Sequence, residues 1–248
     1  MSIQKQLISF AFERAYPYII EQPTIKGFLS QISFILVGSA ATGLCNAGSD
    51  VDICLICDQN TYDTISVGTR WLDGRPTEVI LDGTQLHYYA ISTESLNRKI
   101  AELDGLTFYV YGNAIVIDDA TGQYKQIADK IHDPSLLSQR FGNEIEMLGR
   151  RKRALHYVLN NDIDPMARLE MCSEIIKRLL VCIALYDGRE YDSRKRLYRT
   201  ALLGATGNLL QSKIDAMISL VGTACRTENT MAATEFLELF DYCFDYIS

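Results

Sequence analysis

Residues 37–53 read VGSAATGLCNAGSDVDI, and this stretch decides how the rest of the chain is interpreted. It continues an apolar run over residues 32–37, which is typical of a buried strand. Gly38 and Ser39 stand where that strand ends. We expect Ser39 to cap a short helix that runs through Leu44. Backbone N–H groups at such a helix start suit the binding of phosphate.

Two carboxylates follow at alternate positions of a second predicted strand over residues 50–56. Side chains at i and i+2 of a strand project from one face, so Asp50 and Asp52 lie close together. Like charges at that separation repel unless a cation lies between them. Oxygen-only ligation on a rigid strand suits Mg²⁺, and two such metals can clamp an in-line displacement. Asp-x-Asp and Gly-Ser are each common in ordinary strands and loops, and only their combination at this spacing is specific.

Composition excludes several classes of protein. With 248 residues, 48% hydrophobic and 22% charged, the chain is an ordinary globular protein with room for one or two cores. The net charge of −7 argues against a protein that grips long nucleic acid, since that needs a dominant basic surface. The apolar runs are too short to cross a membrane, and Glu13 interrupts the first segment before a cleavable leader develops.

The cysteines point to a reducing compartment. Seven cysteines are an odd number, and most of them stand in apolar surroundings, which predicts free, buried thiols in the cytoplasm. Cys54 and Cys57 form a C-x-x-C pattern that is typical of redox or zinc chemistry. We interpret this pair as structural, because both residues fall within the predicted strand and no second ligand pair follows.

The remaining periodicity divides the chain into two domains. An amphipathic helix over residues 2–18 precedes the strands, and helices over residues 61–72 and 92–103 follow, the latter capped by Ser92. Asp82 and Gly83 predict a hairpin turn between strands. The predicted strands after the Asp-x-Asp pair cover residues 77–81, 85–91 and 108–117.

From residue 124 onward every apolar segment has helical spacing, over residues 124–130, 135–160, 165–186, 194–203, 211–225 and 230–246. We therefore predict an α/β domain with a mixed sheet at residues 1–125. An all-helical bundle is expected at residues 126–248.

With these residues in view, the chain resembles the polymerase-β-like nucleotidyltransferase superfamily. The signature of that superfamily is Gly-Ser, a short helix, and Asp-x-Asp between apolar residues. The resemblance covers roughly residues 30–120. The helical half resembles the accessory domain of the small-molecule branch, the aminoglycoside and lincosamide nucleotidyltransferases, and residues 77–96 resemble the lincosamide enzymes in particular.

The resemblance implies a set of site residues. Asp50 and Asp52 would bind Mg²⁺, and the co-substrate would be an NTP such as ATP. A basic residue of the helical domain contacts nucleotide phosphate in these families. The implied nucleotide-binding residues are Gly38, Ser39, Ser49, Lys177 and Lys195.

The family's third carboxylate is replaced here. The matching position on the strand over residues 85–91 is His87. A neutral imidazole can accept a hydroxyl proton near pH 7, which supports a catalytic role. It is a poorer Mg²⁺ ligand than a carboxylate. Alternatively, His87 packs on the strand or marks a lost active site, and Glu78 or Asp82 supplies the missing carboxylate.

We therefore expect a cytoplasmic, magnesium-dependent nucleotidyltransferase that moves a nucleoside monophosphate from an NTP to a hydroxyl of a small molecule. Tyr88 and Tyr89 are candidates to line the acceptor pocket, although aromatic residues in strands more often belong to the core. Two alternatives stay open: an enzyme acting on a protein or an RNA end, and a catalytically silent relative that binds a nucleotide or a partner. No membrane partner is expected, and a homodimer is compatible with the sequence.

Overall fold

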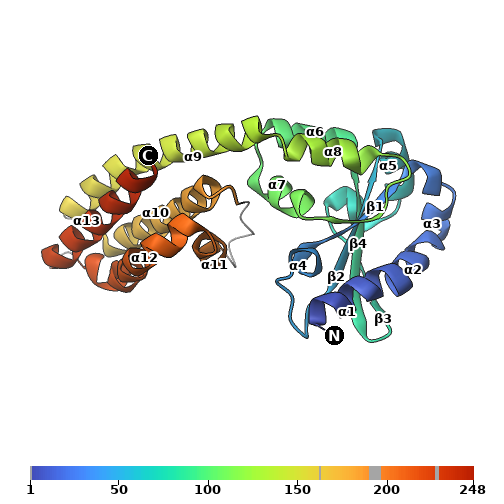
Figure 1. The fold of residues 1–248 in the computed structure, drawn as a ribbon, viewed down its shortest axis with the longest axis horizontal. Helices are drawn as coiled ribbons and strands as arrows, with labels where there is room; N and C mark the ends of the chain where they lie inside the picture. The colour runs from blue at the N-terminus through green and yellow to red at the C-terminus, as the bar shows by residue number, and fades with distance from the viewer. Residues whose placement is uncertain (1, 162, 190–196, 227–228) are drawn as a thin grey trace. The chain divides into compact units, whose positions relative to one another are not determined.

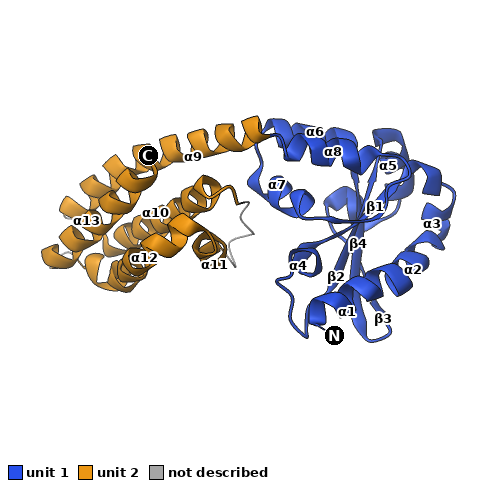
Figure 2. Cartoon of the chain, viewed as in Figure 1, with its two compact units in different colours: residues 1–133 blue, residues 134–248 orange. Residues whose placement is uncertain are grey.

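The computed structural model describes residues 2–161, 163–189, 197–226 and 229–248. The chain forms two compact units, Met1–Asp133 and Pro134–Ser248 (Figure 2). The boundary predicted after residue 125 falls inside helix α8 (Gln123–Ile131), which contacts strands β1 and β2 of the first unit.

A mixed sheet forms the centre of the first unit (Figure 1). Within the described residues it has five strands in the order β3-β4-β2-β1-β5. The β2–β4 pairing is parallel, and the other pairings are antiparallel. This confirms the predicted α/β class with a mixed sheet. The strands are β1 (Ser33–Val37), β2 (Val51–Cys57), β3 (Thr77–Leu81), β4 (Thr84–Ser92) and β5 (Ile115–Asp118).

Helices cover both faces of the sheet. The amino-terminal helical segment shares one core with the strands, in which Ala11, Ala15 and Ile19 are buried with Phe34 and Leu36. On the other face, the Cys54 thiol of β2 lies 4.0 Å from the Tyr111 hydroxyl. The helical elements of this unit, besides α8, are α1 (Ile3–Phe10), a π-helical turn (Ala11–Ala15), α2 (Tyr16–Ile20), α3 (Pro23–Lys26), a 3-10 turn (Leu29–Gln31), α4 (Gly38–Thr42), α5 (Gln59–Ser66), η3 (Arg70–Asp73), α6 (Thr93–Ala101) and α7 (Gly105–Gly112).

The predicted hairpin and the predicted cap of α6 are confirmed. Asp82 and Gly83 have φ values of 50° and 80°, which is the geometry of a type I′ turn. The Ser92 hydroxyl accepts a hydrogen bond from the Ser95 backbone N–H at 3.2 Å and so caps α6.

The strand predicted over residues 108–117 is wrong in its first half, because helix α7 occupies that part. Asp104 caps this helix by accepting hydrogen bonds from the Thr107 N–H at 3.1 Å and its hydroxyl at 2.6 Å. The aromatic and β-branched residues of α7 favour a strand by propensity. Burial of Phe108 and Tyr111 under the sheet outweighs that propensity. The helix predicted over residues 61–72 is also interrupted, by Gly68 at φ 73°.

The second unit is helical, as predicted. Helix α10 contacts α9, α11, α12 and α13. Helix α12 begins before the predicted residue 211, because the Asp187 carboxylate accepts hydrogen bonds from the backbone N–H groups of Thr206 and Gly207. The helices are α9 (Pro134–Asn160), α10 (Pro165–Tyr186), α11 (Leu197–Leu202), α12 (Ala205–Ala224) and α13 (Thr230–Ile247). The predicted helix over residues 194–203 begins outside the described residues, and α11 is its described part.

Free cysteines occur in both units. Six of the seven are buried, and only Cys45 is partly exposed. The thiols of the C-x-x-C pair are buried and are not bonded to each other. None of the described helices is long and apolar enough to cross a membrane.

Candidate functional site

Parallel pairing of β2 and β4 brings the two parts of the predicted site together. The register sets Asp52 beside His87, and Asp50 directly precedes β2. His87 Nδ1 lies 3.0 Å from an Asp50 oxygen and 3.3 Å from an Asp52 oxygen. One donor atom from each residue lies within 4.8 Å of the others. Among the described residues, this trio forms the one cluster of potential metal ligands.

The two carboxylates lie close together and are partly buried. The Asp52 side chain is 26% exposed. Burial raises the pKa of Asp52 to about 6, and the charge of Asp50 raises it as well, whereas the contact with His87 lowers it. A divalent cation between the carboxylates would relieve this repulsion, which is the electrostatic character of a cation site.

Gln85 holds the His87 ring from its other side. The Gln85 amide nitrogen lies 2.9 Å from His87 Nε2. With that nitrogen as donor, the ring proton resides on Nδ1 and faces the carboxylates. Rotation of the amide presents its oxygen instead, which moves the proton to Nε2 and frees Nδ1 to accept one. Gln85 is not among the predicted site residues, although its position two residues before His87 on one strand indicates that the two side chains share a face.

Gly38 is required by both its conformation and its surroundings. Its φ is +72°, in the region that favours glycine, and a Cβ atom there would lie 2.3 Å from an Asp52 oxygen. The backbone that follows β1 therefore packs directly against the metal-ligand candidate. Gln4 contacts the second half of α4 by donating hydrogen bonds to the Ala40 carbonyl at 3.2 Å and the Ala41 carbonyl at 3.5 Å. Nothing in the sequence around Gln4 pointed to this contact.

The predicted helix cap at Ser39 is wrong. Helix α4 begins at Gly38, so Ser39 lies inside the first turn, and the N-cap residue is Val37, which makes no capping hydrogen bond through its side chain. The helix also ends at Thr42 rather than Leu44, since Gly43 adopts φ 76°. The Ser39 hydroxyl oxygen is buried and has no hydrogen-bond partner in the described part of the chain. An unpaired buried hydroxyl is costly, and a phosphate oxygen is a suitable acceptor for it.

Ser49 shapes the loop that leads to Asp50. Its hydroxyl accepts a hydrogen bond from the Asn46 N–H at 2.9 Å, and the Asn46 side chain accepts one from the Gly48 N–H. This arrangement fixes the turn immediately before the first carboxylate.

The two substitute carboxylates lie outside the cluster. Glu78 stands directly across from His87 in the β3–β4 register, on the same face of the sheet, but its side chain is exposed. Asp82 lies in the hairpin turn and pairs with Arg14 at 2.6 Å. Of the two, Glu78 is therefore nearer to the site.

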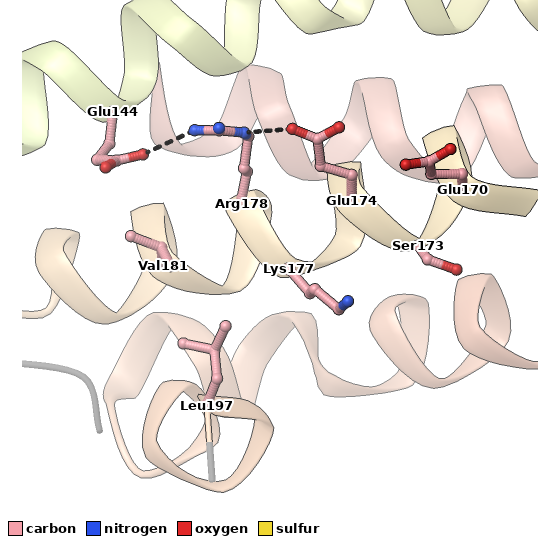
Figure 3. Close-up of a pocket in the computed structure, with 8 residues that line it drawn as sticks. All are labelled: Glu144, Glu170, Ser173, Glu174, Lys177, Arg178, Val181 and Leu197. Carbon is pink, nitrogen blue, oxygen red and sulfur yellow. Dashed lines mark hydrogen bonds and ion pairs between the residues drawn. The ribbon is translucent and has the colours of Figure 1, made fainter. Parts of the chain in front are cut away.

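The predicted lysines belong to the second unit. Lys177 lines a cavity of about 510 Å³ within that unit (Figure 3). In the same cavity Arg178 pairs with Glu144 at 3.4 Å and Glu174 at 3.1 Å, as Figure 3 shows, whereas no interaction is drawn for Lys177. Lys195 lies outside the described residues.

Comparisons with known proteins agree with this geometry. Residues 23–107 match the family model of the nucleotidyltransferase domain. This segment contains β1 to β4 and hence Asp50, Asp52 and His87. Residues 23–107 are therefore similar to nucleotidyltransferase domains, which supports the predicted resemblance to the polymerase-β-like superfamily.

A solved structure shares the fold. It is the crystal structure of a nucleotidyltransferase-like protein from Exiguobacterium sibiricum 255-15, with a TM-score of 0.52 and 9% sequence identity. The match covers 97% of this chain and 75% of that chain. No curated protein matches the chain by sequence.

Proposed function

We propose that this chain transfers a nucleoside monophosphate from an NTP such as ATP to a hydroxyl of a small molecule, releasing pyrophosphate in a Mg²⁺-dependent reaction. The convergence of Asp50, Asp52 and His87 within 4.8 Å, inside a nucleotidyltransferase domain, supports this most strongly. The net charge of −7 favours a small acceptor over a polynucleotide. The sequence resemblance to the small-molecule branch points the same way. Free thiols favour the cytoplasm as the place of action.

The residues present fit a hard divalent cation. Asp50 and Asp52 offer carboxylate oxygens, the ligands that Mg²⁺ prefers. When bound, the ion neutralises charge on the phosphates and the carboxylates. In this proposal the unpaired Ser39 hydroxyl donates to a phosphate oxygen, and Gly38 lets the phosphates approach the backbone. Ser49, Lys177 and Lys195 remain proposed phosphate contacts.

His87 is the proposed proton acceptor. The acceptor oxygen forms a bond to the α-phosphorus while the bond from that phosphorus to pyrophosphate breaks. The hydroxyl proton passes to Nδ1 of His87, with the Gln85 amide oxygen holding the proton on Nε2. A second candidate function, nucleotide binding without turnover, is favoured by one observation. Nδ1 contacts both carboxylates, so a protonated His87 can occupy the place of a cation.

Calorimetry with Mg²⁺ and ATP, GTP, CTP or UTP tests the metal site. The parent protein should bind an NTP only with the divalent cation. The double variant Asp50→Asn with Asp52→Asn should lose this dependence, because the charge that holds the ion is gone. Asp129→Asn, which changes an exposed carboxylate of α8, serves as the control. Unchanged Mg²⁺-dependent binding in the double variant would remove the metal-site proposal.

Pyrophosphate release, measured with a panel of hydroxylated acceptors and with water, tests His87. His87→Ala should lower turnover by roughly 10²–10⁴-fold, the usual contribution of a positioned general base. His87→Glu restores an oxygen ligand and should keep activity with Mg²⁺. If the turnover of His87→Ala equals that of the parent, His87 is not the proton acceptor of the reaction. A silent parent whose His87→Glu variant gains activity would establish the second candidate function.

A further inference from the structure

A cavity of about 420 Å³ lies at the edge of the sheet, within the first unit. The β3–β4 register ends at the pair Thr77 and Tyr88, whereas β4 continues beside β2 as far as Ser92. Side chains of α5 and η3 line one part of the cavity, and side chains of α6 and α7 line another. We call this cavity the edge pocket. Its lining includes Tyr62, Trp71, Tyr89, Lys99, Leu106 and Tyr111.

The aromatic lining is held in position without a ligand. The Tyr62 hydroxyl donates to the Trp71 carbonyl at 3.2 Å, and the Trp71 indole N–H donates to the Thr77 hydroxyl at 3.1 Å. The Trp71 ring also packs edge-to-face on Tyr88, with centroids 5.9 Å apart. A binding surface that needs no rearrangement avoids the entropic cost of ordering side chains.

Apolar side chains stand exposed around the edge pocket. Leu72 and Leu106, which both line it, are 62% and 53% exposed. They belong to η3 and α7, two separate elements of the unit. Exposed leucines beside a pocket with an aromatic lining favour a ligand with an apolar, ring-shaped body.

Lys99 places a cation in the lining of the edge pocket. The Lys99 side chain is partly buried and has no ion pair or side-chain hydrogen bond within the described residues. Asp104 also lines the pocket, but its carboxylate already accepts two hydrogen bonds from Thr107 at the start of α7. A partly buried ammonium beside aromatic rings is best satisfied by an anionic group of a ligand.

We propose that the edge pocket binds a small aromatic acid, with its ring among the aromatic side chains and its carboxylate or phosphate on Lys99. The volume is within the usual range of small-molecule sites. Tyr89 follows His87 by two residues on β4, a separation of about 7 Å along the strand. The acid can therefore be the acceptor of the nucleotidyl group, an interpretation that rests on the proposed function. Alternatively, it is an effector that binds and is not modified.

Fluorescence of Trp71, the single tryptophan of the chain, tests binding directly. The probes are benzoate, 3-(4-hydroxyphenyl)propionate and the methyl ester of the latter, which keeps the ring and removes the charge. The acids should change the emission in a saturable way. The ester should bind about tenfold more weakly, as should the acids to Lys99→Gln, because a charge-assisted hydrogen bond is lost.

Arg98→Gln is the matched control, since Arg98 neighbours Lys99 on α6, is exposed and does not line the pocket. It should bind the acids like the parent, and thermal unfolding should show that both variants fold. The inference is overturned if neither acid gives a saturable response. It also fails if the ester binds as tightly as the acid, or if Lys99→Gln binds like the parent.

Addition of Mg²⁺–ATP separates this inference from the proposed function. The acid and the nucleotide should bind together, and the Asp50→Asn, Asp52→Asn variant should still bind the acid. Competition between them would overturn the inference, because the edge pocket would then hold the nucleotide. Acid binding with no Mg²⁺-dependent nucleotide binding contradicts the proposed function alone. A nucleotidylated product of 3-(4-hydroxyphenyl)propionate identifies the acid as acceptor, and acid binding without such a product identifies it as effector.

Discussion

At the residue scale, Asp52 connects the parts of the candidate site. Its carboxylate lies 3.3 Å from His87 Nδ1 and occupies the space that a side chain at Gly38 would need. The sequence predicted the carboxylate pair, because alternation on a strand fixes which side chains share a face. It did not predict the Gly38 contact or the Gln85 bond, since these depend on how β1, β2 and β4 pack.

The raised pKa of Asp52, about 6 against an ordinary 3.8, predicts how stability depends on pH. A group whose pKa is higher in the folded state stabilises the fold below its unfolded pKa. That stabilisation is lost as pH rises through the folded pKa. Metal-free protein should therefore lose stability between about pH 4 and pH 6, by about 1–3 kcal/mol. Urea unfolding in EDTA across this range measures the loss.

Asp52→Asn should remove this pH-dependent loss and be more stable than the parent at pH 7.5 without metal. Asp129→Asn, a change of an exposed carboxylate, should follow the parent curve. Addition of Mg²⁺ should stabilise the parent and leave Asp52→Asn nearly unchanged. If the stability of the parent does not fall relative to that of Asp52→Asn between pH 4 and pH 6, burial does not raise the pKa of this carboxylate.

At the element scale, local signals predicted some boundaries well and others poorly. The hairpin followed from the Asp82-Gly83 pair, and α6 followed from its Ser92 cap, because both signals act within a few residues. Helix α7 was mistaken for a strand, since its helical state depends on burial against the sheet. The start of α12 was not predicted, because the carboxylate that accepts hydrogen bonds from its first turn belongs to Asp187, 19 residues before Thr206.

Arg168 shows another long-range link, between two helix ends of the second unit. Its buried guanidinium donates to the Leu159 carbonyl at 3.0 Å and the Ala224 carbonyl at 3.1 Å, in the last turns of α9 and α12. Arg168→Met should destabilise the protein by about 2–4 kcal/mol, because both carbonyls lose a charged donor. Urea unfolding followed by circular dichroism measures the change.

Arg153→Met is the matched control, because Arg153 is exposed on α9 and has no ion pair within the described residues. It should change the free energy of unfolding by no more than about 0.5 kcal/mol. Equal stability of the two variants would show that the helix ends are held together without Arg168.

At the scale of the whole molecule, each unit has its own hydrophobic core. One core gathers residues from Ala11 to Ala90, and the other gathers residues from Leu148 to Ile247. The division into a catalytic domain and an accessory domain is a proposal about function. It predicts that bound nucleotide stabilises the first unit more than the second. A way to observe each unit separately would therefore be informative.

The buried cysteines allow such a measurement, because the rate at which each thiol is modified reports how often its unit opens. Burial raises the pKa of Cys54 and Cys172 to about 12, so neither thiol reacts until its surroundings open. A thiol-modifying reagent should label Cys45 quickly and the six buried cysteines slowly, as peptide mass spectrometry can resolve. Mg²⁺–ATP should slow the labelling of Cys54 and Cys57 more than that of Cys172, and equal slowing would show that the units open as one.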